Sequence, residues 1–287
     1  MNTYQLLDSG NNEKLEVIHG YKIIRPSLTS PYQKTDLALW EDADAIYHKN
    51  EKGGGKWQFT QEIPEDLFIQ HQGMHFKIKL TPFGHIGLFP EQEQNWKLLR
   101  KIGSLLPEIE TLNLFAYSGS STIAGLQAGL SLCHVDSSKG MVSWARENAL
   151  ASQVADKKVR WIVDDVQKFI KREVKRKKKY LGFILDPPTF GRGSKGEVWK
   201  IEKNLIELFE NLMRLCDAKP AFVILSCHSS GYSPLSLERI LRSYIKEKGL
   251  FSSQELRVKE EYGHYLSGGF CAYFLCDKLK SLYSEIS

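Results

Sequence analysis

The chain has 287 residues, of which 42% are hydrophobic and 25% charged, as in an ordinary globular protein. Its formal net charge of +5 is unevenly spread, because eight Lys and Arg residues stand against the single acid Glu173 within Lys168–Lys179 and the rest of the chain is slightly negative. These features exclude a disordered chain, a collagen-like chain and a uniformly basic nucleic-acid coat protein.

Cysteine and histidine usage argues against disulfide and metal chemistry. The five cysteines form no C-x-x-C pair, and the eight histidines include no pair at helical i, i+4 spacing. We therefore expect no disulfide framework and no metal site, as in a reducing compartment. The first residues lack a basic segment followed by an apolar one, and no apolar run approaches the roughly 20 residues of a membrane span. The sequence thus predicts a cytoplasmic protein without a membrane anchor.

The first part of the chain is typical of a small antiparallel β domain. Turn-forming residues separate short aromatic or alternating runs, which are Tyr21–Ile24, Trp57–Thr60 and Phe76–Leu80. From Glu91 onward the apolar spacing of the sequence becomes helical. We predict a β-rich accessory domain over residues 1–88 and a second domain over residues 89–287.

In the second domain, apolar strands alternate with amphipathic helices, which indicates an α/β fold with a parallel sheet covered on both faces. The predicted strands are Thr111–Phe115, Leu132–Val135, Val159–Val163, Leu181–Leu185 and Ala221–Cys227. The predicted helices are Thr122–Gly129, Lys139–Ser152, Val166–Lys175, Glu202–Leu215 and Leu235–Lys248, the last ended by Gly249. Two tail strands are expected at Glu255–Val258 and Phe270–Leu275.

The ends of three successive strands carry residues suited to an adenosine group. The first strand runs into a turn at Ser118–Ser120, where Gly119 lets a ligand lie against the backbone. The second ends in Asp136, whose carboxylate can accept hydrogen bonds from both ribose hydroxyls. The third ends in Asp164 and Asp165, where a carboxylate can accept the adenine amine. Because the turn has one glycine and no G-x-G-x-x-G, S-adenosylmethionine (SAM) suits it better than a dinucleotide.

The fourth strand ends in Asp186-Pro187-Pro188-Thr189-Phe190. Two prolines fix the backbone, so the Asp186 carboxylate is held rigidly beside the methyl donor. The ring of Phe190 is then available to stack on a planar acceptor. We take Asp186, Pro187, Pro188 and Phe190 as candidate catalytic residues.

Together these motifs resemble the class I SAM-dependent methyltransferases, and within them a bacterial 23S rRNA methyltransferase-like group marked by L-N-x-F-x-Y-T-G and D-P-P-x-F. Here the motifs are Leu112–Gly119, with Ser118 in place of the usual Thr, and Asp186–Phe190. The resemblance implies a Rossmann-like seven-stranded sheet with Phe270–Leu275 antiparallel to its neighbours, and RNA as partner. It also implies a set of cofactor-binding residues: Gln92, Phe115, Ala116, Tyr117, Ser118, Gly119, Asp136, Ser137, Asp164, Asp165 and Val166.

Two base chemistries remain open. Methylation of cytosine C5 needs a nucleophile, and the thiol of Cys227, in Leu225–Ser229, stands at the end of the fifth strand where His228 can lower its pKa. Methylation of guanine N7 needs only orientation, because that nitrogen already has a lone pair. In the alternative function, a small-molecule or protein methyltransferase, the β domain would form the acceptor pocket.

Two further features concern the surface that an acceptor would meet. The basic run is expected near the amino ends of the strands, opposite the cofactor, where a solvated face or an accessory phosphate contact both fit. Arg192, Lys195 and Lys200 flank the D-P-P-T-F loop and are better placed for phosphates. Trp199 is expected to be exposed there and to frame the substrate mouth.

Overall fold

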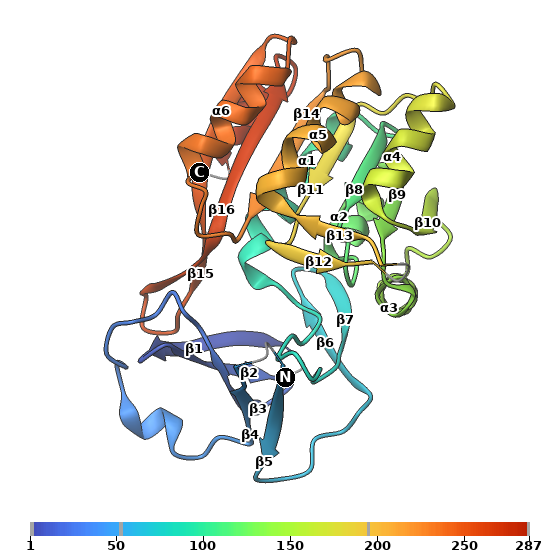
Figure 1. Cartoon of the computed structure of the whole chain (residues 1–287). Helices are drawn as coiled ribbons and strands as arrows, with labels where there is room; N and C mark the ends of the chain where they lie inside the picture. Colours follow the sequence, from blue (N-terminus) through green and yellow to red (C-terminus); the bar gives the residue numbers. More distant parts are fainter. Residues whose placement is uncertain (1–2, 52–53, 194–195, 286–287) are drawn as a thin grey trace. The chain divides into compact units, whose positions relative to one another are not determined.

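The computed structural model describes residues 3–51, 54–193 and 196–285. The chain divides into two compact units (Figure 1). Unit 1 comprises Met1–Glu91 together with Arg257–Gly268, and unit 2 comprises Gln92–Leu256 together with Gly269–Ser287. This division is discontinuous in sequence, unlike the single boundary expected between residues 88 and 89. In the described part of the chain, no helix is long and apolar enough to cross a membrane.

Unit 1 is built on a five-stranded sheet in the order β1-β2-β3-β4-β5, whose one parallel pair is β3 with β4. Its strands are β1 (Tyr4–Gly10), β2 (Glu13–Ile18), β3 (Tyr21–Pro26), β4 (Ala45–Lys49) and β5 (Gly55–Phe59). A 3-10 helix, η1 (Leu37–Trp40), precedes β4, and a separate hairpin follows β5, formed by β6 (Leu67–His71) and β7 (Met74–Ile78). The predicted N-terminal β-rich region is thereby confirmed.

A buried ionic cluster joins β1, β2 and β3 in this sheet. The Glu16 carboxylate, fully buried, accepts hydrogen bonds from Arg25 Nε at 2.6 Å and Arg25 Nη2 at 2.7 Å. It also accepts one from the Tyr4 hydroxyl at 2.9 Å and pairs with Lys14 at 3.2 Å. Burial opposes ionisation of Glu16, but the two cations and their hydrogen bonds lower its pKa to about 2.

The tip of the C-terminal hairpin belongs to unit 1. Leu6 and Glu260 form a β-bridge, the backbone N–H of Glu261 donates to Leu6 O at 3.1 Å, and the Ser9 hydroxyl donates to the Glu260 carboxylate. Thr29 adds a hydrogen bond from its hydroxyl to Ser267 O at 2.8 Å. The sheet of unit 1 is therefore completed by residues that lie about 250 positions further along the sequence.

Unit 2 contains a seven-stranded sheet in the order β10-β9-β8-β11-β14-β16-β15. Its strands are β8 (Glu110–Leu114), β9 (Ser131–Asp136), β10 (Val159–Val163), β11 (Gly182–Leu185), β14 (Phe222–Cys227), β15 (Gly249–Lys259) and β16 (Tyr265–Cys276). The first five in this order are parallel, and β16 runs antiparallel to β14, with Cys227 opposite Phe270. The predicted seven-stranded Rossmann-like sheet with an antiparallel last strand is confirmed.

Helices cover both faces of this sheet (Figure 1). Helices α4 (Val166–Lys175), α5 (Ile201–Arg214) and α6 (Pro234–Tyr244) lie on the nearer face. Behind it lie α1 (Glu93–Leu105), which follows the 3-10 turn η2 (Pro90–Gln92), and α2 (Ser120–Gln127), while α3 (Lys139–Ala151) packs on α2 and β9. A last 3-10 segment, η3 (Lys280–Glu285), follows β16.

Two local expectations were wrong. Helix α6 ends at Tyr244, because Ile245 is buried in the core and the N–H of Lys246 donates to Ala218 O at 2.8 Å. Gly249 then begins β15 rather than ending a helix. A Cβ at this position would lie 2.2 Å from Leu275 O, so the glycine permits close contact with β16. The strand predicted at Glu255–Val258 is therefore part of the much longer β15.

The cluster around Glu16 gives a first prediction. In the variant Glu16→Gln, Arg25 and Lys14 keep their charges but lose the compensating carboxylate, which is expected to destabilise the protein by about 3–5 kcal/mol. Chemical denaturation followed by circular dichroism measures this loss. As control, Asp277→Asn removes an exposed partner of Lys280 and should change stability little. Equal stability of the two variants would contradict the role given to the cluster.

Candidate active site

The register of the parallel strands brings the predicted residues to one edge of the sheet. Leu114 of β8 lies opposite Val135 of β9 and Leu185 of β11. The next residues, Phe115, Asp136 and Asp186, therefore lie at the same level of the sheet edge, and Asp136 is the last residue of β9. Open α/β sheets bind their ligands at this carboxyl edge.

Asp136 is held by two backbone amides. Its Oδ2 accepts a hydrogen bond from Tyr117 N at 2.9 Å, and its Oδ1 accepts one from Ser138 N at 2.9 Å. Each oxygen keeps a further lone pair, so the carboxylate can also accept from a pair of hydroxyls. Burial raises the pKa of Asp136 although both amides favour the charged form. Ser137, which follows, is partly buried.

The connection from β8 to α2 has an unusual backbone. Phe115, Tyr117 and Gly119 have positive φ angles of 56°, 48° and 89°, in alternation with Ala116 and Ser118. Left-handed conformations are costly for non-glycine residues and concentrate at functional sites. Here the surroundings hold them, since Ala116 N donates to Val135 O at 3.1 Å and Asn148 Nδ2 donates to Ser118 O at 2.9 Å. The turn is thus a preformed backbone surface at the sheet edge.

Gly119 ends this turn and is the N-cap of α2. Besides its positive φ, a Cβ added to it would lie 2.9 Å from Ala145 Cβ of α3. Glycine therefore allows both the left-handed conformation and the close approach of α2 to α3.

The residues after β10 are engaged in local structure. Asp164 N donates to Asp136 O at 3.0 Å, and the Asp164 carboxylate pairs with Arg172. Asp165 is the N-cap of α4, its Oδ1 accepting from Lys168 N at 2.9 Å, and Val166 is buried in the core. An adenine amine would therefore meet carboxylates that are already fixed in position.

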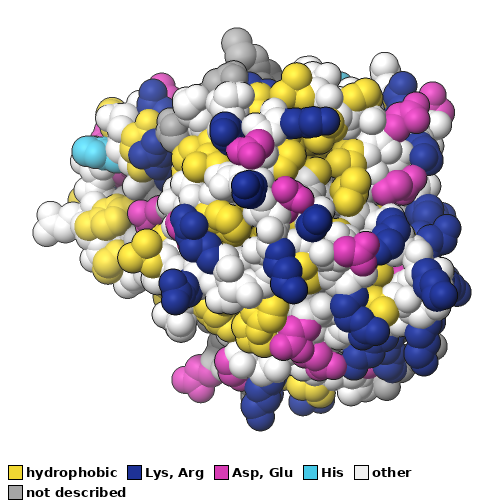
Figure 2. Space-filling model, turned by 90° about the horizontal axis from the view of Figure 1, so that it is seen from above, with side chains coloured by type: hydrophobic (Ala, Val, Ile, Leu, Met, Phe, Trp, Pro, Cys, Tyr) yellow, Lys and Arg dark blue, Asp and Glu magenta, His cyan; other side chains and the backbone are white. Residues whose placement is uncertain are grey.

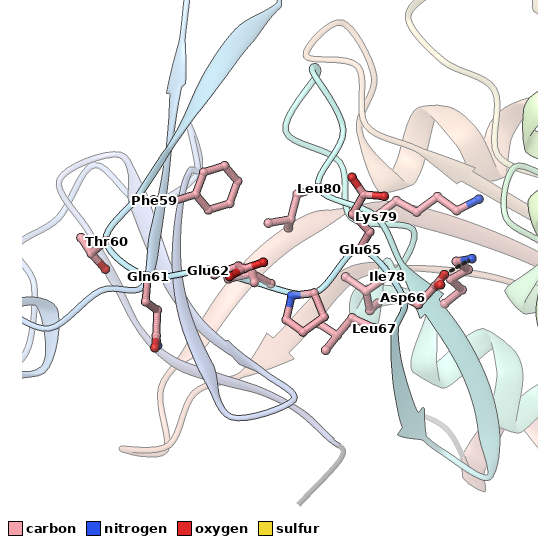
Figure 3. Close-up of a pocket in the computed structure, with 13 residues that line it drawn as sticks. Phe59, Thr60, Gln61, Glu62, Glu65, Asp66, Leu67, Ile78, Lys79 and Leu80 are labelled. Atoms are coloured by element: carbon pink, nitrogen blue, oxygen red, sulfur yellow. Dashed lines mark ion pairs between the residues drawn. The ribbon is translucent and has the colours of Figure 1, made fainter.

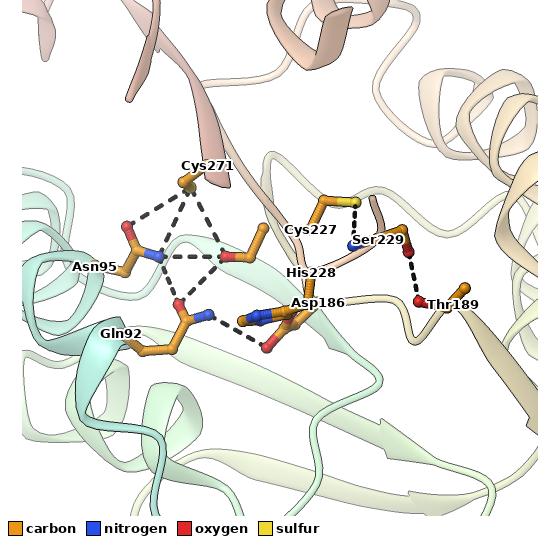
Figure 4. Close-up of polar contacts among 9 residues, drawn as sticks. Gln92, Asn95, Asp186, Thr189, Cys227, His228, Ser229 and Cys271 are labelled. Atoms are coloured by element: carbon orange, nitrogen blue, oxygen red, sulfur yellow. Dashed lines mark hydrogen bonds and ion pairs between the residues drawn. The ribbon is translucent and has the colours of Figure 1, made fainter. Parts of the chain in front are cut away.

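Asp186 lies between two polar side chains (Figure 4). Gln92 Nε2 donates to Asp186 Oδ2 at 3.2 Å, and His228 Nε2 lies 3.2 Å from Asp186 Oδ1. Gln92 comes from the turn before α1, Asp186 follows β11, and His228 follows β14. The structure thereby brings Gln92, predicted from the sequence, into contact with the predicted acceptor loop.

A buried network, not anticipated from the sequence, fixes the amide of Gln92 (Figure 4). Gln92 Oε1 accepts from Asn95 Nδ2 at 2.6 Å and from Ser226 Oγ at 3.2 Å, so its amino group is left facing Asp186. Asn95 Oδ1 in turn accepts from the Tyr273 hydroxyl at 2.7 Å. The i, i+3 spacing of Gln92 and Asn95 was the one sequence signal for it. Tyr273 lies on β16, too far along the chain to be paired by pattern.

The D-P-P-T-F loop continues into a hairpin formed by β12 (Phe190–Arg192) and β13 (Val198–Lys200). Trp199 anchors it, donating from Nε1 to Pro188 O at 2.7 Å and packing on Phe115 with ring centroids 4.7 Å apart. The expectation that Trp199 is exposed was wrong, because its ring fills the space between these residues and is 7% exposed. Phe190, by contrast, is 51% exposed. Pro187 is buried and Pro188 exposed.

Cys227 is enclosed at the end of β14. Its side chain is completely buried in the hydrophobic core, and Sγ accepts a hydrogen bond from Ser229 N at 3.5 Å. Burial raises the pKa of the Cys227 thiol, and the charge of Asp186 adds to the effect. Such a thiol is mostly protonated at neutral pH, unlike reactive cysteines.

The basic run forms ion pairs along much of its length. Five of its eight cations have acidic partners: Lys168 with Glu197, Lys171 with Glu207, Arg172 with Asp164, Arg176 with Glu173, and Lys179 with Asp217. Seen from above, the surface accordingly shows acidic side chains among the gathered Lys and Arg (Figure 2). Near the acceptor loop, Arg192 lies 5.8 Å from the Phe190 ring, while Lys195 lies outside the described residues.

The donor set of this edge fits SAM. Carboxylates stand at the carboxyl ends of three strands of the sheet: Asp136 at β9, Asp164 and Asp165 after β10, and Asp186 after β11. Negative charge there disfavours a pyrophosphate and favours a cofactor that carries a sulfonium and an ammonium group. Among the residues that the structure describes, no cluster of three His, Cys, Asp or Glu side chains is arranged to hold a metal ion.

Comparison with solved structures identifies the family. A SAM-dependent methyltransferase from Agrobacterium tumefaciens is 30% identical, with a TM-score of 0.89 over 95% of this chain and 90% of that protein. The chain belongs to the SAM-dependent methyltransferases. The fold also matches SMU.776, a methyltransferase solved with SAH, at 18% identity and a TM-score of 0.73 over 95% of this chain and 74% of that one. Membership of the SAM-dependent methyltransferases makes SAM the cofactor of this chain. No protein-family model matches the chain.

Curated relatives add a distant similarity to rRNA enzymes. "Ribosomal RNA large subunit methyltransferase K/L" of Shewanella frigidimarina is 28% identical over 169 residues, which is 58% of this chain and 23% of that protein. The protein of the same name from Vibrio campbellii is 27% identical over 177 residues, or 61% and 24%. The matched region thus spans about a quarter of these relatives' length.

Asp136 gives a prediction on pH. In its expected role, the ionised Asp136 carboxylate would accept hydrogen bonds from the ribose hydroxyls. SAM affinity should then fall as the pH falls through its raised pKa and the carboxylate takes up a proton. Asp136→Ala should weaken SAM binding by about 1–3 kcal/mol and remove this pH dependence. Titration calorimetry at several pH values tests both, with Asp156→Ala as the surface control. Unchanged affinity of Asp136→Ala would overturn the assignment.

Gly119 gives a second prediction for the site. Gly119→Ala should lower the free energy of unfolding by more than the roughly 1–2 kcal/mol of left-handed strain, since its Cβ also meets Ala145. It should weaken SAM binding as well. Gly129→Ala is the matched control, because Gly129 has a φ of 85° but open space around its Cβ. Denaturation and calorimetry of both variants separate strain from steric conflict.

Proposed function

We propose that this methyltransferase acts on a nitrogen of a nucleobase in RNA, such as guanine N7, rather than on cytosine C5. The observation that carries the proposal is the contrast between two predicted residues of one edge. The Phe190 ring is half-exposed on the loop that begins with Asp186, whereas the Cys227 thiol is enclosed in the core. A flat acceptor can reach the first, but a covalent step would require the second.

The acceptor loop is suited to orienting a base. Trp199 and Ser229 fix it, the latter through a 2.6 Å contact between the hydroxyls of Thr189 and Ser229. A base stacked on Phe190 would present its edge to Asp186, whose carboxylate can accept hydrogen bonds from an amino group. Gln92 and His228 hold that carboxylate from two sides.

Methylation of a ring nitrogen would then require of the protein mainly that it position the base against the methyl donor. When bound, SAM supplies an electrophilic methyl group on a positively charged sulfur. A ring nitrogen would accept the methyl group with its own lone pair as the methyl carbon–sulfur bond breaks and the sulfur keeps that electron pair. The residues of the loop would contribute by orientation and proximity. The names of the curated rRNA methyltransferases support RNA as the acceptor class.

The proposal predicts that Cys227 is dispensable. Cys227→Ser should keep methyl transfer within about tenfold of the native rate, since positioning carries the reaction. Asp186→Ala is the contrasting variant and should lose most activity while keeping SAM affinity. The measurement is transfer of tritium from labelled SAM onto total RNA, protein and small-molecule fractions.

Two outcomes would contradict the proposal. Loss of turnover in Cys227→Ser, with a covalent adduct trapped by RNA that contains 5-fluorocytosine, would establish the cytosine C5 reaction. Label in the protein or small-molecule fraction, and none in RNA, would establish the alternative acceptor class.

A further inference from the structure

Unit 1 contains a cavity of about 560 Å³ that the methyl-transfer site does not use. Strands β2, β3 and β4 supply Lys14, Arg25 and Lys49 to it, and the segment after β7 supplies Phe83 and Phe89. Cations interleaved with aromatic rings are typical of sites for single-stranded nucleic acid.

The cavity has an excess of positive charge. Lys14 and Arg25 share the single buried carboxylate of Glu16. Burial lowers the pKa of Lys14 and the neighbouring Arg25 adds to the effect, while the carboxylates of Glu16 and Glu91 act in the opposite direction. Lys49 is exposed and has no ion pair within the described residues, while Glu91 is the one acid that lines the space.

An aromatic ring is displayed at the rim on a tightly held turn. Three donors fix its backbone: the Tyr47 hydroxyl to Pro82 O, Trp57 Nε1 to Thr81 O and Arg25 Nη1 to Gly84 O, each at 2.8 Å. Phe83 nevertheless is 66% exposed. A rigid backbone with an exposed ring is a stacking surface whose ordering cost is already met before a ligand binds.

The other charged features of the chain fit RNA less well. The larger cavity of unit 1, about 860 Å³ between Phe59 and the β6–β7 hairpin, is lined by Glu62, Glu65 and Asp66 (Figure 3). Its Lys77 is ion-paired with Asp66. The basic run Lys168–Lys179 is largely paired with acids, as described above.

We propose that the 560 Å³ cavity binds a nucleotide of single-stranded RNA, with the base stacked on Phe83 and the phosphate beside Lys49 and Lys14. The site would select the RNA that the acceptor loop methylates, so the inference rests on the proposed function. It assigns RNA recognition to unit 1 rather than to the basic run.

Fluorescence anisotropy of the full chain with a labelled single-stranded RNA of about ten nucleotides, without SAM, tests the proposal. Phe83→Ala should weaken binding roughly tenfold, and Phe83→Trp should restore it, because stacking tolerates any aromatic face. Phe59→Ala, an exposed ring of the other cavity, and Lys177→Ala, in the basic run, are the controls and should bind as the native chain does.

Salt dependence tests the phosphate contact separately. Lys49→Ala should reduce the slope of log affinity against log salt by about 0.7, the value for one phosphate contact on a single strand, whereas Phe83→Ala should leave the slope unchanged. Calorimetry with SAM confirms that each variant is folded, since its SAM affinity should equal that of the native chain.

The outcomes separate this inference from the function on which it rests. If the native chain methylates RNA but Phe83→Ala and Lys49→Ala bind it normally, the cavity is not the recognition site and the proposed function stands. If the native chain neither binds nor methylates RNA, both fail. Equal, Phe83-dependent binding of a polyglutamate peptide would assign the cavity to an acidic protein and overturn the proposal.

Discussion

The hydrogen-bond register of β8 between β9 and β11 is the constraint on which the site depends. It places Phe115, Asp136 and Asp186 on one row, and continues through β14 to Ser226 and through β16 to Cys271. A shift of one residue in any of these strands would turn its functional side chain to the other face of the sheet. The turn after β8, the loop after β11 and the polar network behind Gln92 therefore share a single geometric origin.

The sequence was sufficient to predict features that depend on local motifs or on periodic apolar spacing. Continuous apolar strands alternating with amphipathic helices indicated the parallel sheet. The polar residues at the strand ends were expected to lie at one edge, and the register places them there. Prediction from sequence failed where partners are far apart in the chain. Nothing near Asn95 indicates its contact with Tyr273, 178 positions away. The burial of Trp199 depends on Phe115, which follows β8. The early end of α6 likewise follows from a contact with Ala218, not from its own composition.

The distribution of charge is likewise not predictable from sequence alone, because charged partners can lie far apart along the chain. Lys168–Lys179 is conspicuous along the sequence, yet folding gives five of its cations acidic partners. These come from α4 itself, from α5, and from the connections after β10, after α5 and before β13. Lys14, Arg25 and Lys49 are unremarkable in sequence, but three strands bring them to one cavity. Local electrostatic potential depends on the balance of charges within a Debye length, which only the folded chain defines.

The interleaving of the two units has a consequence for synthesis. Domains generally fold in the order in which they leave the ribosome. The sheet that starts at Tyr4 takes hydrogen bonds from Glu261 and Ser267 in the hairpin tip, so its last contacts await almost the whole chain. Until Glu260 has been synthesised, the Ser9 hydroxyl lacks the carboxylate to which it donates a hydrogen bond in the finished protein. A nascent chain interrupted after unit 2 begins would carry an unfinished first unit, whereas the finished chain closes both units with one late hairpin.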